Sequence, residues 1–349
     1  MSVFQKVLNS LKLQIFPNIE NKKSAEPAVA IASPTDSGSP YRAYAITMLL
    51  KAYGNVAPIP EQYPLYYAHE CGLTNPKSLH LQLIEEGFLE PSSISQLLTI
   101  LKVSELQQML RSCGLKVSGK KEELINRILS NINTEDLLSF FKDEPPRYSL
   151  SIKGTTFLDQ HKDYIRFHRY TRYGVTIAEY EHAKASFYST DCEQILIFLY
   201  NQKLRKDEYN RLYHLVLHKL YEAIGDSDNA LREFLIVKYF DVNYVYAFQQ
   251  LDSMLQYLSF PEAARSVYEC QKDCYVLSPN DAVYIAQHPN IHLQNVLNSI
   301  YSHYVLKDLL IPKSIFSTIL SEMLSKSFFD ISKWNTYILE QLKHYLRLH

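Results

Sequence analysis

From Thr176 to the end of the chain, the sequence consists almost entirely of amphipathic segments with helical spacing. Several helix start signals occur in this region. Thr176 and Thr190 are each followed three residues later by glutamate, and Ser278 is followed by proline. Such spacing is not the period-two alternation of strands. We therefore predict an all-α domain over residues 176–349 in a mainly α protein. The predicted helices are 191–203, 206–224, 228–240, 243–258, 261–273, 279–287, 291–308, 314–327 and 331–348.

The composition is that of a globular protein with balanced charge. The chain has 349 residues, of which 36 are Lys or Arg and 37 are Asp or Glu, and 46% are hydrophobic. This length allows two or three domains, and the charge balance excludes a uniformly basic, histone-like DNA binder. No apolar run approaches the roughly 18 residues that span a bilayer, so we predict no membrane partner. Only nine glycines are present, which argues against Gly-rich cofactor loops, and we expect no cofactor.

The cysteine pattern indicates a reducing compartment. The five cysteines are odd in number and do not form a disulfide framework. Cys270 and Cys274 are the only close pair, without a second pair at zinc spacing, so we expect no metal site. Residues 1–16 lack the continuous apolar block of a signal peptide. We expect a cytoplasmic protein, associated with the nucleoid if it is bacterial.

Residues 1–40 are predicted to be a flexible N-terminal segment and linker. Apolar residues recur at helical spacing within residues 3–15, which fits either a short docking helix or a frayed terminus. Residues 20–40 hold three prolines and many small polar residues, a composition typical of flexible linkers. The apolar positions are Val3, Phe4, Val7, Leu8 and Leu11.

Residues 41–53 are predicted to form an amphipathic helix that ends at Gly54, and residues 64–90 show the pattern of helix, turn, helix and strand. The second helix of the pair is predicted to have Asn75 as its N-cap, proline at its first position, and Gly87 at its end. These helix start and stop residues are typical of a helix-turn-helix. Its second helix would then present Lys77 and His80 to a DNA groove, together with Gln82.

Residues 101–130 predict two short amphipathic helices joined by a tight loop. Gly114 ends the first helix, and Ser118 is expected to cap the second, which opens with Gly119 and two lysines. The residues expected to face the core are Val103, Leu106, Leu110, Leu115, Val117, Leu124, Ile125 and Ile128.

This stretch resembles the SAP motif, a helix–loop–helix DNA-binding module. The likeness covers residues 97–131, within a module that we bound at 95–133, and it fills nearly every expected position. It implies DNA binding through the loop and the start of the second helix, and we expect a bacterial or phage protein. The matching residues are Leu106, Leu110, Gly114, Leu115, Ser118, Gly119, Lys120, Lys121, Leu124 and Arg127.

The chemistry of these residues also indicates phosphate binding. The first amides of a helix have no internal partner and attract anions, and Gly119 lets a phosphate approach the backbone. Residues 95–132 contain six bases and three acids, a net charge of 6 − 3 = +3. The alternative is a helical hairpin with solvated lysines. The candidate DNA contacts here are Lys102, Lys116, Ser118, Gly119, Lys120, Lys121 and Arg127.

The segments on either side of this module fit one winged-helix-like unit. Residues 147–158 begin with strand-like alternation. We predict that residues 87–90 and 148–152 pair as antiparallel strands. Residues 41–90 and 147–173 would then form one unit, with the SAP-like helical hairpin inserted in its wing, because exposed wing tips tolerate insertions. The alternative is a series of separate small domains.

Residues 147–173 form a second basic stretch, with six bases and two acids, or 6 − 2 = +4. Its aromatic residues Tyr164, Phe167 and Tyr170 either stack on bases or form a core that the arginines cover, and the second alternative is favoured. The further candidate DNA contacts are Arg166, Arg169 and Arg172.

The sequence shows no catalytic constellation. His69 and Glu70 do not continue into a zinc-protease motif, and residues 114–121 (GLKVSGKK) fail as a P-loop because Lys121 replaces the magnesium-holding Ser or Thr. From Arg205 onward there are 14 bases and 16 acids, a net charge of −2, which suits a protein-binding or self-association surface.

We therefore expect a non-catalytic DNA-binding protein that mostly contacts the phosphate backbone. Residues 176–349 would mediate assembly or recruit a protein partner. The alternatives are a nuclease- or recombinase-like enzyme that the SAP-like module targets to DNA, and a protein-interaction adaptor.

Overall fold

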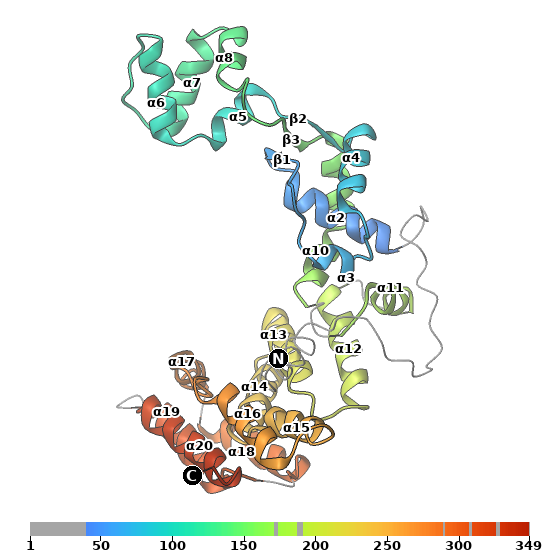
Figure 1. Cartoon of the computed structure of the whole chain (residues 1–349), viewed down its shortest axis with the longest axis vertical. Coiled ribbons are helices and arrows are strands. Elements are labelled where there is room, and N and C mark those ends of the chain that lie inside the picture. Colours follow the sequence, from blue (N-terminus) through green and yellow to red (C-terminus); the bar gives the residue numbers. More distant parts are fainter. Residues whose placement is uncertain are drawn as a thin grey trace. The chain divides into compact units, whose positions relative to one another are not determined.

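The computed structural model describes residues 40–170, 174–186, 191–288, 290–306, 309–325 and 329–348. The fold is mainly α, with one small three-stranded antiparallel sheet (Figure 1). It divides into two compact units, one that ends at Leu196 and one that begins at Ile197. The helical region that begins at residue 176 is thus shared between them. Residues 1–39, Thr190 and Arg172, about which we made predictions, lie outside the described residues.

The first unit contains a winged-helix arrangement. Its strand order is β1-β3-β2, and β2 pairs antiparallel with β3, with Leu89 opposite Leu150 and Pro91 opposite Tyr148. The predicted strand pairing is confirmed, but the strand ends at Leu150, and Ile152, which we expected in it, begins the following helix and is 89% exposed. Residues 92–146 are inserted between the two strands. The elements are α2 (Pro40–Tyr53), β1 (Ala57–Pro58), α3 (Tyr66–His69), α4 (Pro76–Glu85), β2 (Leu89–Pro91) and β3 (Arg147–Leu150).

Local sequence explains why these elements start and stop where they do. The Asn75 side chain accepts the Ser78 amide at 3.0 Å, as predicted for an N-cap. Gly87 ends α4 with a φ of 75°, a left-handed conformation that favours glycine. Pro58 and Pro91 lie in the two outer strands, where the missing amide costs no ladder hydrogen bond.

Helices α9 (Ile152–Gln160), α10 (Lys162–His168) and α11 (Ile177–Ser186) pack around α2 and complete the unit before α12 (Cys192–Leu204). The α9 helix lies very close to the strand entry, because a Cβ at Gly154 would come within 2.2 Å of the Phe88 carbonyl oxygen. The Lys153 ammonium donates to the Glu86 carbonyl at 2.7 Å, which satisfies the C-terminus of α4.

The inserted residues form a helical module with its own core. Its helices are α5 (Ile94–Ile100), α6 (Val103–Ser112), α7 (Lys121–Asn131) and α8 (Thr134–Phe140). One prediction was wrong: Val103 is 41% exposed, and Met109 is buried instead. Val103 is the first residue of α6, and it is not among the residues of the module core, although its spacing from Leu106 fits the buried face. The core residues are Leu98, Leu106, Met109, Leu110, Leu124, Ile125, Ile128, Ile132 and Leu137.

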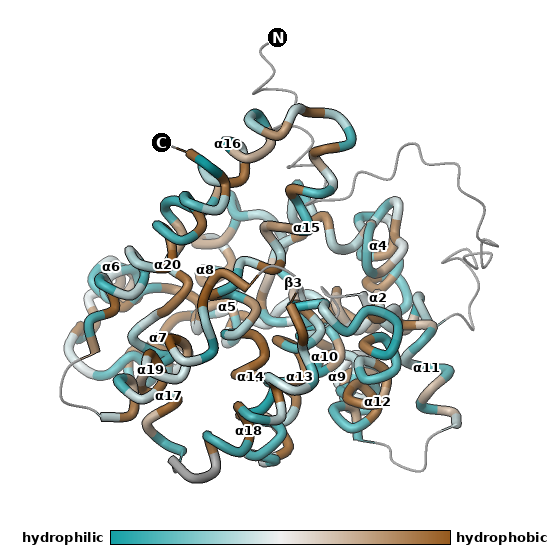
Figure 2. The backbone as a smooth tube through the Cα atoms, turned by 90° about the horizontal axis from the view of Figure 1, so that it is seen from below, coloured by the Kyte–Doolittle hydropathy of each residue, from teal (hydrophilic) through white to brown (hydrophobic). Residues whose placement is uncertain are grey.

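The second unit is built around α14, which is largely hydrophobic (Figure 2) and packs along α13. All nine helices predicted from residue 191 onward are found. The α13 helix starts at Arg211 rather than near 206, because Asn210 accepts the amides of Leu212 and Tyr213 and caps it. The helices are α13 (Arg211–Ile224), α14 (Ser227–Val242), α15 (Val245–Met254), α16 (Phe260–Gln271), α17 (Pro279–Ile285), α18 (Asn290–His303), α19 (Lys313–Leu324) and α20 (Ile331–Tyr345).

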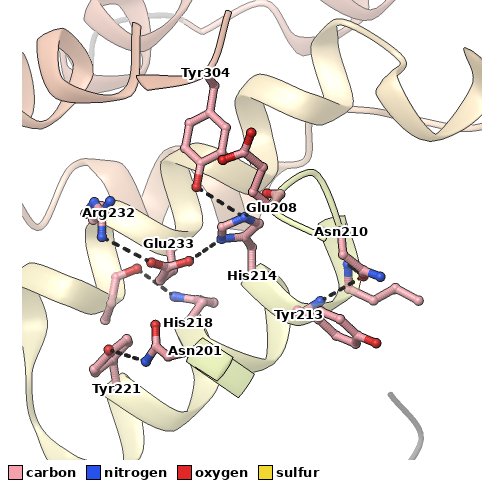
Figure 3. Close-up of polar contacts among 12 residues, drawn as sticks. Asn201, Glu208, Asn210, Tyr213, His214, His218, Tyr221, Arg232, Glu233 and Tyr304 are labelled. Carbon is pink, nitrogen blue, oxygen red and sulfur yellow. Dashed lines mark hydrogen bonds and ion pairs between the residues drawn. The ribbon is translucent and has the colours of Figure 1, made fainter. Parts of the chain in front are cut away.

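A buried polar network joins α13 to α14 (Figure 3). His214 Nδ1 lies 2.5 Å from Glu233 Oε2, and its Nε2 lies 2.9 Å from the Glu208 carbonyl oxygen. Both ring nitrogens therefore lie within hydrogen-bonding distance of an oxygen, and His214 links α13 to Glu233 on α14. The Tyr304 hydroxyl lies 3.4 Å from the same Nε2. Among the described residues, no helix combines the length and apolar character needed to cross a bilayer.

Candidate nucleic-acid interface

Side chains from both flanking helices hold the loop between α6 and α7. Arg127 Nη1 donates to the carbonyl oxygens of Lys116, at 2.5 Å, and Ser118, at 3.1 Å. Gln107 Nε2 donates to the Val117 carbonyl at 3.2 Å. Three consecutive carbonyl groups of the loop are therefore bound from inside the module, which leaves the opposite side of the loop backbone for a ligand.

The start of α7 differs from the prediction. Its N-cap is Lys120 rather than Ser118, and the Lys120 amide donates to Glu123 Oε2 at 3.3 Å. Gly119 has a φ of 139°, and a Cβ at this position would lie 2.5 Å from that carboxylate oxygen. Gly119 therefore makes room for the capping carboxylate as well as for an approaching anion.

The first amides of α7 are available to an anion. As at the start of any α-helix, the amides of Lys121, Glu122 and Glu123 have no partner within the helix. Lys116 and Lys120 are exposed in the residues that precede them, and the acidic side chains of Glu122 and Glu123 lie in the same first turn. Backbone donors, the positive end of the helix dipole and two nearby cations are features that attract phosphate.

The other predicted cations of this module have different surroundings. Lys121 is half-buried, and its ammonium donates to the Thr99 carbonyl at 2.6 Å, which fastens α7 to the end of α5. Arg127 is also half-buried and is engaged with the loop carbonyls. Lys102 is exposed at the N-cap of α6, where its amide donates to Glu105 Oε2 at 2.5 Å.

The second basic stretch does not form an exposed base-stacking surface. Tyr164, Phe167 and Tyr170 are buried, so the favoured alternative, an aromatic core, is confirmed. Arg166 is paired with Asp191 at 2.9 Å and with the buried carboxylate of Glu193. Arg169 is exposed and has no ion-pair partner among the described residues, whereas Arg172 lies outside them.

The exposed face of α4 is poorly suited to a DNA groove. Lys77 is exposed, as expected, but His80 is fully buried. His80 Nδ1 lies 2.8 Å from the Tyr63 hydroxyl, and burial lowers the pKa of the imidazole, so it is a neutral core residue. The exposed Glu85 and Glu86 outnumber the one lysine of this helix.

Two residues that hold the loop were missed by sequence reasoning. Glu123 lies three residues after Lys120, the spacing of a capping box, but lysine is not a typical N-cap and gave no signal. Gln107 is a polar position on an amphipathic helix and has no motif to mark it. Among the described residues, no group of three or more His, Cys, Asp or Glu side chains is arranged to hold a metal ion.

Comparison with known families decides the identity of the inserted module. Residues 101–133 match the family model of the SAP domain. This stretch is a SAP domain. The match covers α6, the loop and α7, and the structure adds α5 and α8 to the same hydrophobic core. The SAP domain implies nucleic-acid binding, with DNA as the partner. No curated protein and no solved structure matches the chain.

Proposed function

We propose that this protein binds DNA through its SAP domain, mainly by contacts to the phosphate backbone. The observation that carries the proposal is the set of three amides at the start of α7 that have no partner within the helix, together with the exposed Lys116 and Lys120. Ser118 and Gly119 belong to the same loop and complete the proposed contact. Because phosphate contacts carry no sequence information, we expect binding with little sequence preference.

Other exposed cations of the first unit are assigned weaker roles. Lys77, Lys102 and Arg169 are exposed, and we propose them as additional contacts that raise the local positive potential. Lys121 and Arg127 act mainly by shaping the module, because their donors are occupied by backbone carbonyl groups. Arg166 is assigned to its ion pairs.

We propose that the second unit mediates assembly or recruits a protein partner. Its net charge from Arg205 onward is 14 − 16 = −2, which does not favour DNA. Large apolar and aromatic side chains are exposed on it, among them Tyr257 at 79% and Tyr275 at 81%. Exposed groups of this kind are enriched at protein interfaces. A catalytic role is not proposed.

The test is fluorescence anisotropy of labelled duplex DNA across a salt series. The double variant Lys116→Gln/Lys120→Gln is expected to lower the slope of log affinity against log salt by about 1.8, because each lost phosphate contact removes about 0.9. The matched control is Lys142→Gln/Lys162→Gln, which removes two exposed lysines elsewhere in the same unit. Equal slopes for the two variants, or no salt-dependent binding by the wild type, would contradict the proposal.

A further inference from the structure

The SAP domain has a surface groove that is not part of the proposed DNA contact. It has a volume of about 470 Å³ and is lined by residues of α6, the end of α5 and the end of α8. Its apolar wall includes Ile100 and Phe140, which are 42% and 44% exposed. Both side chains are large, and neither is fully covered by the described residues. The remaining apolar lining is Leu101, Met109 and Phe141.

The charges around this groove define the partner that fits it. Within the lining, Glu144 pairs with Arg147 at 3.6 Å, and Lys102 and Glu105 cancel each other in net charge. The adjoining segment is acidic even with Arg147 included, since residues 134–147 contain two bases and four acids, 2 − 4 = −2. An occupant should therefore be apolar on one side and basic on the other. The four acids are Glu135, Asp136, Asp143 and Glu144.

Residues 1–16 of this chain have that character. They contain Lys6 and Lys12 and no acid, a net side-chain charge of +2. Their apolar residues recur at helical spacing, as described above. Residues 17–39 separate this segment from Pro40, and 23 residues can extend to about 80 Å. The other stretches outside the described residues have at most four residues, too few to fill the groove.

We propose that residues 1–16 dock in this groove as an amphipathic helix of the same chain. The apolar side of the segment packs against Ile100 and Phe140, and its two lysines face the acidic segment 134–147. Docking adds a helix to the SAP domain and buries its exposed apolar wall. The proposal does not depend on DNA binding, so failure of one leaves the other intact.

The experiment is hydrogen–deuterium exchange of the full-length protein, without DNA, in wild type and two variants. Ile100→Glu places a charge in the groove wall. The matched control is Leu129→Glu, because Leu129 is 40% exposed on α7, outside the groove lining. Circular dichroism melts check that both variants keep the fold. In wild type and in the control, we expect the amides of residues 3–15 to exchange at least about tenfold more slowly than in Ile100→Glu.

Each other outcome overturns the proposal. Fast exchange of residues 3–15 in the wild type means that the segment does not dock. Slow exchange that persists in Ile100→Glu means that it docks elsewhere. Slow exchange that appears only at high protein concentration, together with a dimer in size-exclusion chromatography with light scattering, means that the occupant belongs to a second copy.

Discussion

At the residue scale, the role of each cation depends on what its donors already bind. Arg127 and Lys120 both belong to the SAP pattern, yet their side chains have different surroundings. The guanidinium of Arg127 holds two loop carbonyl groups, whereas the Lys120 side chain is exposed. Arg127 therefore shapes the loop, as does the uncharged Gln107.

This difference gives a prediction for Gln107. Gln107→Ala is expected to weaken DNA binding by about 1 kcal/mol, the typical value of one hydrogen bond, with an unchanged salt slope, because no phosphate contact is lost. Salt-dependent anisotropy measures both quantities. The control is Gln108→Ala, which removes the neighbouring exposed glutamine. The assignment fails if Arg127→Gln lowers the slope by about 0.9 while Gln107→Ala has no effect.

At the scale of elements, a buried histidine–carboxylate contact connects two helices of the second unit. His214 on α13 and Glu233 on α14 are both buried, and the Glu208 carbonyl lies on the other side of the imidazole (Figure 3). The contact therefore helps to set the position of α13 on α14.

Removing the carboxylate of Glu233 should destabilise the second unit. Glu233→Gln keeps the size of the side chain but removes the carboxylate that contacts the buried imidazole of His214 and lies 3.6 Å from Arg232, which should cost about 2 kcal/mol, as for a hydrogen bond to a charged group. Urea unfolding is followed by the fluorescence of Trp334, the only tryptophan of the chain, which lies in the core of this unit. The control, Glu222→Gln, affects an exposed partner of His218 and should cost at most about 1 kcal/mol. Equal costs for the two variants would refute the structural role of the His214–Glu233 contact.

At the scale of the whole molecule, the SAP domain takes the place of a wing tip. Ser92 and Arg147 still face each other at the base of the insertion, where the Ser92 amide donates to the Arg147 carbonyl at 2.9 Å. The insertion therefore begins and ends at one point of the sheet. The α4 helix, which would read DNA in many winged-helix proteins, has a buried histidine and exposed glutamates here. DNA contact is thus assigned to the inserted domain.

Excision of the inserted domain tests this division of roles. Residues 93–146 are replaced by Asn-Gly, a two-residue connection that suits the antiparallel pair β2–β3. The shortened protein is expected to keep its helical circular dichroism and to lose most of its salt-dependent DNA affinity. Unaltered affinity would place the DNA contact in the winged-helix unit or the second unit. Loss of the folded signal would show that the SAP domain is needed for the sheet.

Much of the element order could be predicted from the sequence by itself. Helix boundaries depend on capping residues at fixed short offsets, such as Asn75 and Ser278, and the amphipathic period is a local property. The SAP domain was recognisable for the same reason, since its pattern lies within 33 consecutive residues. Even the pairing of β2 with β3 followed from the helix-turn-helix order and the strand-like alternation after Pro146. The helices α5 and α8 and the short strand β1 were not predicted.

Only the tertiary structure decided which side chains are free to meet a ligand. His80 is buried against Tyr63, 17 residues away, and Arg166 is bound by Glu193, 27 residues away. The Lys121 ammonium is held by Thr99, on a different helix. The role of a polar or charged residue depends on the partners that folding brings to it, and these partners are remote in the sequence. Local pattern therefore located the SAP domain, whereas long-range packing decided which charged side chains remain exposed.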